Sequence, residues 1–150
     1  MKHGYEFILK LFKHKPISPK TDLNAALRFA LNVLKRKSVV ILISDFLDTE
    51  YEYNLKALAQ KHDLVVVHLY DQREVRLPSL GTIPVMDRES GQIVWVNTSS
   101  IFVKRDIRDA IQHNQEQLEK ICKQNNANYI SIDSQEDYVP QLIQLFRIRN

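Results

Sequence analysis

The apolar positions along the chain fall into two kinds of spacing, and their order predicts an α/β fold. Apolar residues recur every three or four positions, as in amphipathic helices, within 5–12, 23–34, 51–59, 107–122 and 139–146. A continuous apolar run, as in parallel strands covered on both faces, lies at 39–43; residues 64–69 repeat this apolar strand pattern, and NYISI at 128–132 is the third expected core strand. We therefore expect three layers: a mostly parallel sheet flanked by helices, with a right-handed βαβ unit at its start.

Residues 82–97 depart from this pattern and predict a β-hairpin insertion. Two short apolar strands, 83–86 and 93–96, flank the segment DRESGQ. Gly91 in this segment supplies the conformational freedom that a hairpin turn needs. The expected hairpin lies between the second parallel strand and the long helix that follows it.

Length and composition match one globular domain. The chain has 150 residues, of which 44% are hydrophobic and 26% charged. Its apolar runs are far shorter than the roughly 20 residues that span a bilayer, so we expect no transmembrane segment. Residues 1–15 lack the cleavage site of a secretory signal, which favours a cytoplasmic location. Cys122 is the only cysteine, which excludes an internal disulfide and paired-cysteine metal motifs.

The charge of the chain points only weakly to nucleic acid. The formal net charge is +3, and basic residues gather at 10–15 and 35–37. Nucleic-acid binding proteins carry such basic patches. Basic residues beside helix ends are also typical of a solvated face that the helix dipole favours. We rank nucleic-acid binding last among the functions considered.

Several common enzyme chemistries have no motif in this chain. Gly4, Gly81 and Gly91 are the only glycines, too few and too scattered for a dinucleotide fingerprint or a Walker loop. No two histidines lie four residues apart on one predicted helix, and no G-x-S-x-G occurs, so zinc hydrolases and nucleophile elbows are unsupported. His62 and His68 lie beside or within a predicted strand, and we expect both to be structural.

One group of oxygen-bearing side chains remains as a candidate site: Thr21, Asp45, Asp48 and Asp71. We expect these residues at or near the carboxyl ends of the parallel strands, where α/β folds bind their ligands. Hard oxygen ligands suit Mg²⁺. The alternative is structural: the Thr21 hydroxyl is the N-cap of the 23–34 helix, and Asp45 is a turn residue.

Long stretches of the chain resemble one bacterial family. They are TDLNAALRFALNVLKRKSVVILISDFLD, YEYNLKALAQKHDLVVVHLYDQREVRLPSLGTIPVMDRESGQIVWVNTSS and EDYVPQLIQLF. Together they are similar to the C-terminal half of the family known as domain of unknown function 58, and the resemblance covers nearly the whole chain. It implies a von Willebrand factor A-like, Rossmann-like fold. It also implies an association with MoxR-type AAA+ ATPases, to which the family is thought to supply a metal-dependent protein-binding module.

The resemblance implies a metal site with one part missing. In von Willebrand factor A domains, the metal-ion-dependent adhesion site joins a D-x-S-x-S, a threonine before a helix and an aspartate after a strand. Thr21 in TDL matches the threonine and Asp45 in ISDF the aspartate, but no D-x-S-x-S occurs. We therefore expect residues 1–150 to form a single partial domain whose first strands would lie before Met1. The intact family fold implies Mg²⁺; this chain alone should not bind it tightly, because two ligands rarely overcome the hydration of the ion.

Two functional hypotheses follow. The first is a non-enzymatic protein-interaction module that acts with a MoxR-type AAA+ ATPase or its client. The alternative is a Mg²⁺-dependent phosphoryl-transfer or hydrolytic enzyme that uses Asp45 and Asp48. Without the expected first strands, the strand that begins at Val39 and ends at Ile43 would become a sheet edge. We therefore expect self-association, strand exchange or coverage by the absent half at this edge.

Overall fold

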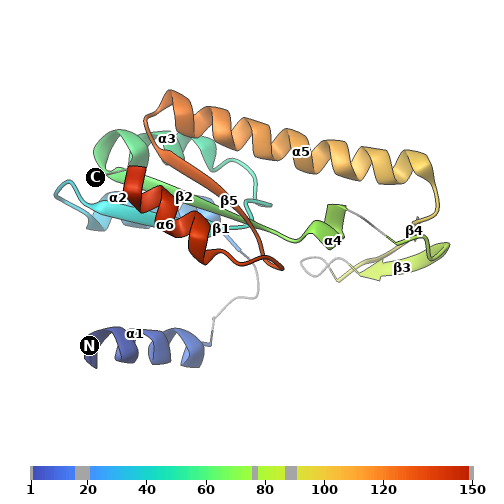
Figure 1. The fold of residues 1–150 in the computed structure, drawn as a ribbon, viewed down its shortest axis with the longest axis horizontal. Helices are drawn as coiled ribbons and strands as arrows, with labels where there is room; N and C mark the ends of the chain where they lie inside the picture. The colour runs from blue at the N-terminus through green and yellow to red at the C-terminus, as the bar shows by residue number, and fades with distance from the viewer. Residues whose placement is uncertain (1, 16–20, 76–77, 87–90, 149–150) are drawn as a thin grey trace.

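The computed structural model describes residues 2–15, 21–75, 78–86 and 91–148 (Figure 1). The helices are α1 (Lys2–Lys13), α2 (Leu23–Val33), α3 (Glu52–Lys61), α4 (Gln72–Val75), α5 (Ile101–Gln124) and α6 (Val139–Ile148). The strands are β1 (Val39–Ser44), β2 (Asp63–Tyr70), β3 (Thr82–Met86), β4 (Ile93–Asn97) and β5 (Asn128–Asp133).

Three parallel strands form one sheet in the order β1-β2-β5, which confirms the predicted α/β class. Ile43 pairs with Val67, and Val67 pairs with Ile130. The chain passes from β1 to β2 through α3 and from β2 to β5 through α5, the helical crossovers that parallel strands require. Strands β3 and β4 form the predicted antiparallel hairpin, although residues 87–90 between them lie outside the described residues.

Helices cover the two faces of the sheet unequally. The main core packs α2, α3 and α5 against one face, and Leu27, Leu58 and Leu118 contribute one fully buried leucine from each of these helices. Successive residues of a strand point to opposite faces, so Val65 and Val67 enter a separate, smaller cluster. That cluster is completed by Ile132 of β5 and Leu145 of α6.

Strand β1 corrects one expectation and confirms another. Its continuous apolar pattern predicts burial on both faces, yet Val39, Ile41 and Ile43 are 61%, 51% and 60% exposed. The side chains of Val40 and Leu42, which point to the other face, pack partly against the main core. The reason is position, because β1 ends the strand order and α6 packs over β2 and β5. The predicted edge position of β1 is confirmed within the described sheet.

The N-terminus of α2 differs from the expected cap. Asp22, and not Thr21, is the N-cap, and its carboxylate accepts a hydrogen bond from the Ala25 amide at 2.7 Å. A second carboxylate, from Asp48 after β1, accepts from the Leu23 amide at 2.6 Å. A helix start offers several unpaired amides, and two aspartates take them here, so the Thr21 cap prediction is wrong.

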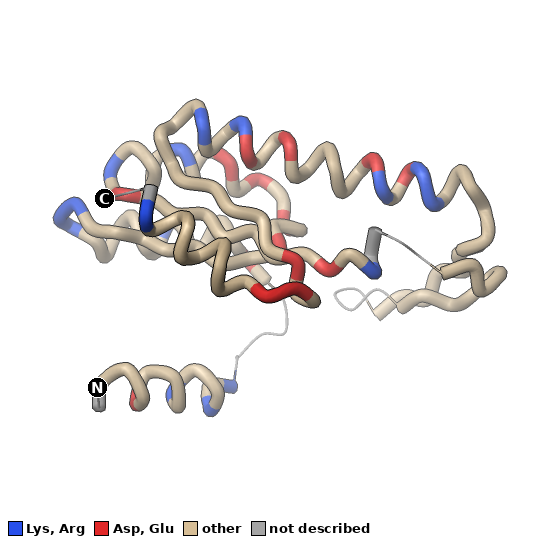
Figure 2. The backbone as a smooth tube through the Cα atoms, in the orientation of Figure 1, with Lys and Arg blue, Asp and Glu red and all other residues tan. Residues whose placement is uncertain are grey.

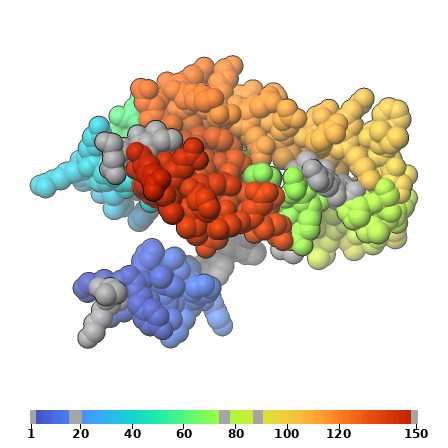
Figure 3. All heavy atoms as spheres, in the orientation of Figure 1, coloured from blue at the N-terminus to red at the C-terminus, as the bar shows by residue number. Residues whose placement is uncertain are grey.

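Helix α1 stands apart from the body of the molecule (Figures 1 and 3). Residues 3–13 of this helix are all exposed, including the large apolar side chains of Tyr5, Ile8 and Phe12. Within the described part of the chain, no helix is long and apolar enough to span a membrane.

Candidate site at the carboxyl end of the sheet

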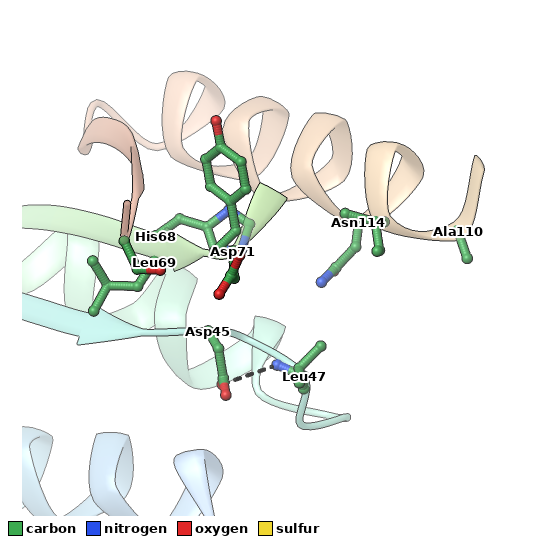
Figure 4. Close-up of a pocket in the computed structure, with 10 residues that line it drawn as sticks. Asp45, Leu47, His68, Leu69, Asp71, Ala110 and Asn114 are labelled. Atoms are coloured by element: carbon green, nitrogen blue, oxygen red, sulfur yellow. Dashed lines mark hydrogen bonds between the residues drawn. The ribbon is translucent and has the colours of Figure 1, made fainter. Parts of the chain in front are cut away.

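The carboxyl ends of the three parallel strands meet beneath α5 and enclose a cavity. Asp45 follows β1 directly, Asp71 follows β2, and Asp133 is the last residue of β5. The cavity has a volume of about 330 Å³, and its lining includes Asp45, His68 and Asp71 from the sheet edge and Ile111 and Asn114 from α5. Figure 4 shows Leu47, in the loop after β1, across this space from the α5 residues Asn114 and Ala110, whereas the carboxylate of Asp45 in the same loop points away from α5.

Asp45 is the least engaged of the strand-end carboxylates. It is exposed, and its Oδ1 accepts from the Leu47 amide and the Ser44 hydroxyl at 3.4 Å each. Both distances exceed the usual range for hydrogen bonds to a carboxylate. The carboxylate can therefore take an external hydrogen-bond donor or cation without breaking a strong internal bond.

Phe46 holds this loop in place. Its ring is buried and lies 5.5 Å from the Tyr51 ring and 5.8 Å from the His68 ring, measured between centroids. Its carbonyl accepts a 3.1 Å hydrogen bond from the side-chain Nδ2 of Asn114, which ties the loop to α5. Its φ of 53° is left-handed. This conformation is strained for a residue other than glycine and persists where the surrounding structure holds it. An anchored Phe46 gives Asp45 a defined position at the cavity mouth.

Two neighbouring acids, Asp48 and Asp71, are committed to internal bonds. Both oxygens of Asp48 accept from backbone amides, at 2.6 Å from Leu23 and 2.7 Å from Thr49. The Arg73 guanidinium binds the Asp71 carboxylate at 2.6 Å and lowers its pKa. Figure 2 shows the acidic residues gathered at this end of the sheet.

Asp133 is a site-edge residue that sequence reasoning missed. It is buried, and its Oδ1 accepts a 3.0 Å hydrogen bond from the Gln135 amide. The signal was available, because Asp133 ends the third apolar strand much as Asp45 and Asp71 follow the first two.

His68 forms the polar floor of the cavity. Its side chain is buried, and Nδ1 lies 3.0 Å from the Tyr129 hydroxyl. Burial lowers the pKa of His68, while a backbone hydrogen bond at Asp45 and the charge of that residue oppose the shift. His62 is also buried, and neither of its ring nitrogens has a hydrogen-bond partner in the described structure. Both side chains are buried, and the structural role expected for them stays a prediction.

The structure keeps the two predicted metal ligands in different settings. Thr21 is exposed just before the α2 cap, and Asp45 lies at the cavity mouth. The loop after β1 is joined to the start of α2 by the hydrogen bond that the Leu23 amide donates to the Asp48 carboxylate. Among the described residues, no group of three or more His, Cys, Asp and Glu side chains is arranged to hold a metal ion. Metal binding by Thr21 and Asp45 stays a prediction.

The fold and the cavity define an α/β protein with an open pocket at the carboxyl end of a parallel sheet. The chain belongs to the family described as Protein of unknown function DUF58, whose model matches residues 1–117. This match confirms the family resemblance. The matched region contains β1, β2, the hairpin and most of α5, together with Asp45.

Relatives of the chain occur in mycobacteria. Uncharacterized protein MAV169 of Mycobacterium avium is 21% identical over 152 residues, which cover 99% of this chain and 89% of that protein. Uncharacterized protein Rv1480 of Mycobacterium tuberculosis and Uncharacterized protein Mb1516 of Mycobacterium bovis are each 23% identical over 135 residues. These alignments cover 89% of this chain but 42% of either relative, so the chain spans less than half of their length. No solved structure matches the chain.

Proposed function

We propose that this chain is a non-enzymatic protein-interaction module of the von Willebrand factor A-like type that works with a MoxR-type AAA+ ATPase. The observation that carries the proposal is the state of Asp45, an exposed carboxylate with only two long internal contacts. It lies at the mouth of a cavity whose rim is fixed by Phe46. A fixed rim with one available charge suits the recognition of a partner side chain.

Two modes of contact are open to Asp45. In the first, its carboxylate accepts hydrogen bonds directly from a basic partner group, a charge-assisted contact. In the second, it holds Mg²⁺ together with Thr21 and with oxygen ligands from outside this chain, and the metal binds an acidic partner group. Mg²⁺ usually keeps several waters and takes few protein ligands, so an incomplete protein site of this kind relies on the partner to complete it.

The enzymatic alternative needs Asp45 and Asp48 to share a catalytic cation. Asp48 gives both of its oxygens to backbone amides, at 2.6 and 2.7 Å. Breaking these hydrogen bonds would leave the Leu23 amide at the start of α2 without its acceptor. This engagement favours the binding module over the Mg²⁺-dependent phosphoryl-transfer or hydrolytic enzyme.

The test compares Asp45→Asn with Asp71→Asn in binding to the MoxR-type ATPase encoded by the same genome. Calorimetry with Mg²⁺ and with a chelator separates the two contact modes. Loss of a charged hydrogen bond of about 1.5–3 kcal/mol should weaken binding by about tenfold or more for Asp45→Asn. Asp71→Asn, whose carboxylate is held by Arg73, should stay near the parent.

Two results would contradict this proposal. One is unchanged ATPase binding by Asp45→Asn. The other is a phosphatase or hydrolase activity of the parent chain that Asp45→Asn abolishes, which would support the enzyme instead.

A further inference from the structure

The outer edge of β1 is an open pairing surface. Strand β1 pairs with β2 on one side, and no strand of the described sheets pairs with its other side. Its exposed face carries Val39, Ile41 and Ile43 in a row. Unpaired backbone groups beside exposed β-branched side chains are a template for an added strand.

Helix α1 is a second apolar surface without a partner. Its apolar residues share one side of the helix, and its polar side carries Glu6, Lys10 and Lys13. Tyr5, Ile8 and Phe12 are among its exposed apolar side chains. A helix of 12 residues is marginal in water without tertiary packing. We therefore expect α1 to pack on an apolar surface, and the uncovered face of β1 is one.

The sequence around β1 is complementary to itself in one antiparallel register. If Ile41 lies opposite Ile41 of a second strand, Val39 lies opposite Ile43, and Val40 opposite Leu42, which keeps apolar residues together on each face. The same register sets Lys37 opposite Asp45 at both ends.

Neighbouring registers lose this match. A shift by two residues in one direction sets Asp45 opposite Val39, and in the other direction it sets Lys37 opposite Ile43. Figure 2 shows the same polarity across the molecule, with Lys and Arg at the turn before β1 and acidic residues near the opposite end of the sheet. Charge complementarity therefore selects a second copy of this chain, in antiparallel orientation, as the occupant of the edge.

We propose that the free edge of β1 pairs with β1 of a second copy, antiparallel about Ile41, and that the α1 helices cover the apolar face of the joined strands. Two three-stranded sheets then form one continuous sheet through a two-fold, isologous contact. The exposed side chains of Val39, Ile41 and Ile43 from both copies form one apolar stripe, which gives α1 a surface to pack on.

The area available is sufficient for a stable dimer. Specific interfaces bury roughly 1,200–2,000 Å² in total. Each α1 carries Tyr5, Phe7 and Phe12, and six aromatic side chains at about 150 Å² each would bury roughly 900 Å². Strand pairing supplies the rest.

The dimer does not depend on the proposed function, although both use the Asp45 carboxylate. In the antiparallel register, the ammonium of the partner's Lys37 approaches Asp45, so dimerisation and ATPase binding compete for the same carboxylate. Dimerisation is measured on the chain alone, without ATPase, so failure of one proposal leaves the other intact.

The first experiment measures the mass of the protein by sedimentation and light scattering at concentrations up to about 1 mM. At about 1 mM, even a dimer with a Kd of about 1 mM is substantially formed. We expect a dimer that Ile41→Lys weakens by about a hundredfold or more, the result of burying an unpaired charge. Val94→Lys adds the same charge at a similarly exposed strand position, 55% against 51%, and should dimerise like the parent. Phe12→Gln should weaken the dimer, whereas Lys10→Gln on the polar side of α1 should not.

The second experiment tests the register in the folded parent background. Ile41→Cys should form a disulfide-linked dimer on oxidation, because opposite residues of an antiparallel pair bring their Cβ atoms to about 4.5–5.5 Å. Ile43→Cys alone should not crosslink, but a mixture of Ile43→Cys and Val39→Cys should. Lys37→Asp should weaken the dimer, and adding Asp45→Lys should restore it, which separates pairing from a folding defect.

Several outcomes would overturn the proposal. A monomer at every concentration would do so, including one whose α1 binds anionic vesicles instead. So would a dimer that tolerates Ile41→Lys, or crosslinking of Ile43→Cys alone in place of Ile41→Cys. A dimer unaffected by Phe12→Gln would overturn the role of α1.

Discussion

Phe46 shows how one residue sets the geometry of the candidate site. Its left-handed backbone costs roughly 1–3 kcal/mol. Burial of its ring returns about 1.5–3 kcal/mol, and the Asn114 bond adds to this. The loop therefore keeps a conformation in which residue 46 points inward and Asp45 stays exposed at the cavity mouth.

At the same scale, the lowered pKa of His68 leads us to expect that the folded chain loses stability in acid. The pKa of His68 in the folded chain is below the 6.5 of the free side chain, chiefly through burial, whereas the unfolded chain has the ordinary value. The unfolded state thus binds more protons near and below pH 6.5, and the stability present above that pH is lost as the pH falls toward the folded pKa. Urea unfolding between pH 8 and 5, run on the parent and on His68→Leu, measures this loss. His68→Leu should show a flatter profile, and His14→Gln, at an exposed position, should match the parent. An equal pH slope in His68→Leu would refute the assignment.

At the scale of elements, short polar contacts join segments that lie well apart in the sequence. The buried Thr98 hydroxyl donates to the Gly81 carbonyl at 2.9 Å and accepts from the Leu80 amide at 3.0 Å. These two bonds close the base of the β3–β4 hairpin. Asp48 plays a similar part between the loop after β1 and the start of α2.

Thr98→Val should loosen the base of the hairpin. The change keeps the shape of the side chain but removes the hydroxyl bonds to the Leu80 amide and the Gly81 carbonyl, at a cost of about 0.5–1.5 kcal/mol for each hydrogen bond; the exposed Leu80 amide keeps its 3.1 Å bond to the Pro78 carbonyl. Hydrogen exchange at Leu80 and along β3 and β4 should accelerate, with little change in β2. Ser99→Ala removes an acceptor of the Gly81 amide at an exposed position, where water can replace it, so its effect should be smaller. Equal acceleration in both variants would contradict this account.

The same scale explains which elements could be predicted. Helical and strand spacing located the parallel strands, the hairpin and the long helix, because those patterns come from neighbouring residues. The burial of β1 could not be predicted in this way, since VVILI at β1 and LVVV at β2 have similar composition and differ only in their neighbours. The predicted cap of α2 was wrong for a similar reason, because Thr21 and Asp22 are both good cap residues and the sequence does not distinguish them.

The candidate site was predictable only in outline. Strand ends identified Asp45 and Asp71 at the cavity, and the same signal existed for Asp133. The engagement of Asp48 with α2 joins residues 25 positions apart, and the bond from Asn114 to Phe46 joins residues 68 apart. Such contacts depend on tertiary packing and leave no local pattern in the sequence.

At the scale of the whole molecule, the buried apolar core is larger on one face of the sheet than on the other. Three helices cover that face, whereas α6 is the one helix of the described structure that contributes to the smaller cluster on the other. Ile143 and Phe146 of α6 remain about half exposed, at 49% and 46%. Cavities created in these two regions should therefore differ in cost.

Leu118→Ala should destabilise the chain more than Leu145→Ala. Leu118 is completely buried among three helices, and its loss should cost about 2–5 kcal/mol of unfolding free energy. Leu145 retains 9% exposure beside partly exposed neighbours, so the site can collapse or admit water at lower cost. Urea unfolding at pH 7.5 compares the two, and equal losses would show that the faces contribute alike.

Helix α5 is held firmly at one end. Its buried residues within the described structure, Leu118, Ile121 and Cys122, lie in its C-terminal third, while Ile101 begins the helix about 25 Å before Leu118 at 1.5 Å per residue. A helix fixed in this way can pivot about its C-terminal third. A tilt of about 10° would move the end beside the hairpin by about 4 Å but Asn114 by only about 1 Å. A large displacement of the N-terminal end of α5 would therefore produce only a small displacement of Asn114, which binds the carbonyl of Phe46.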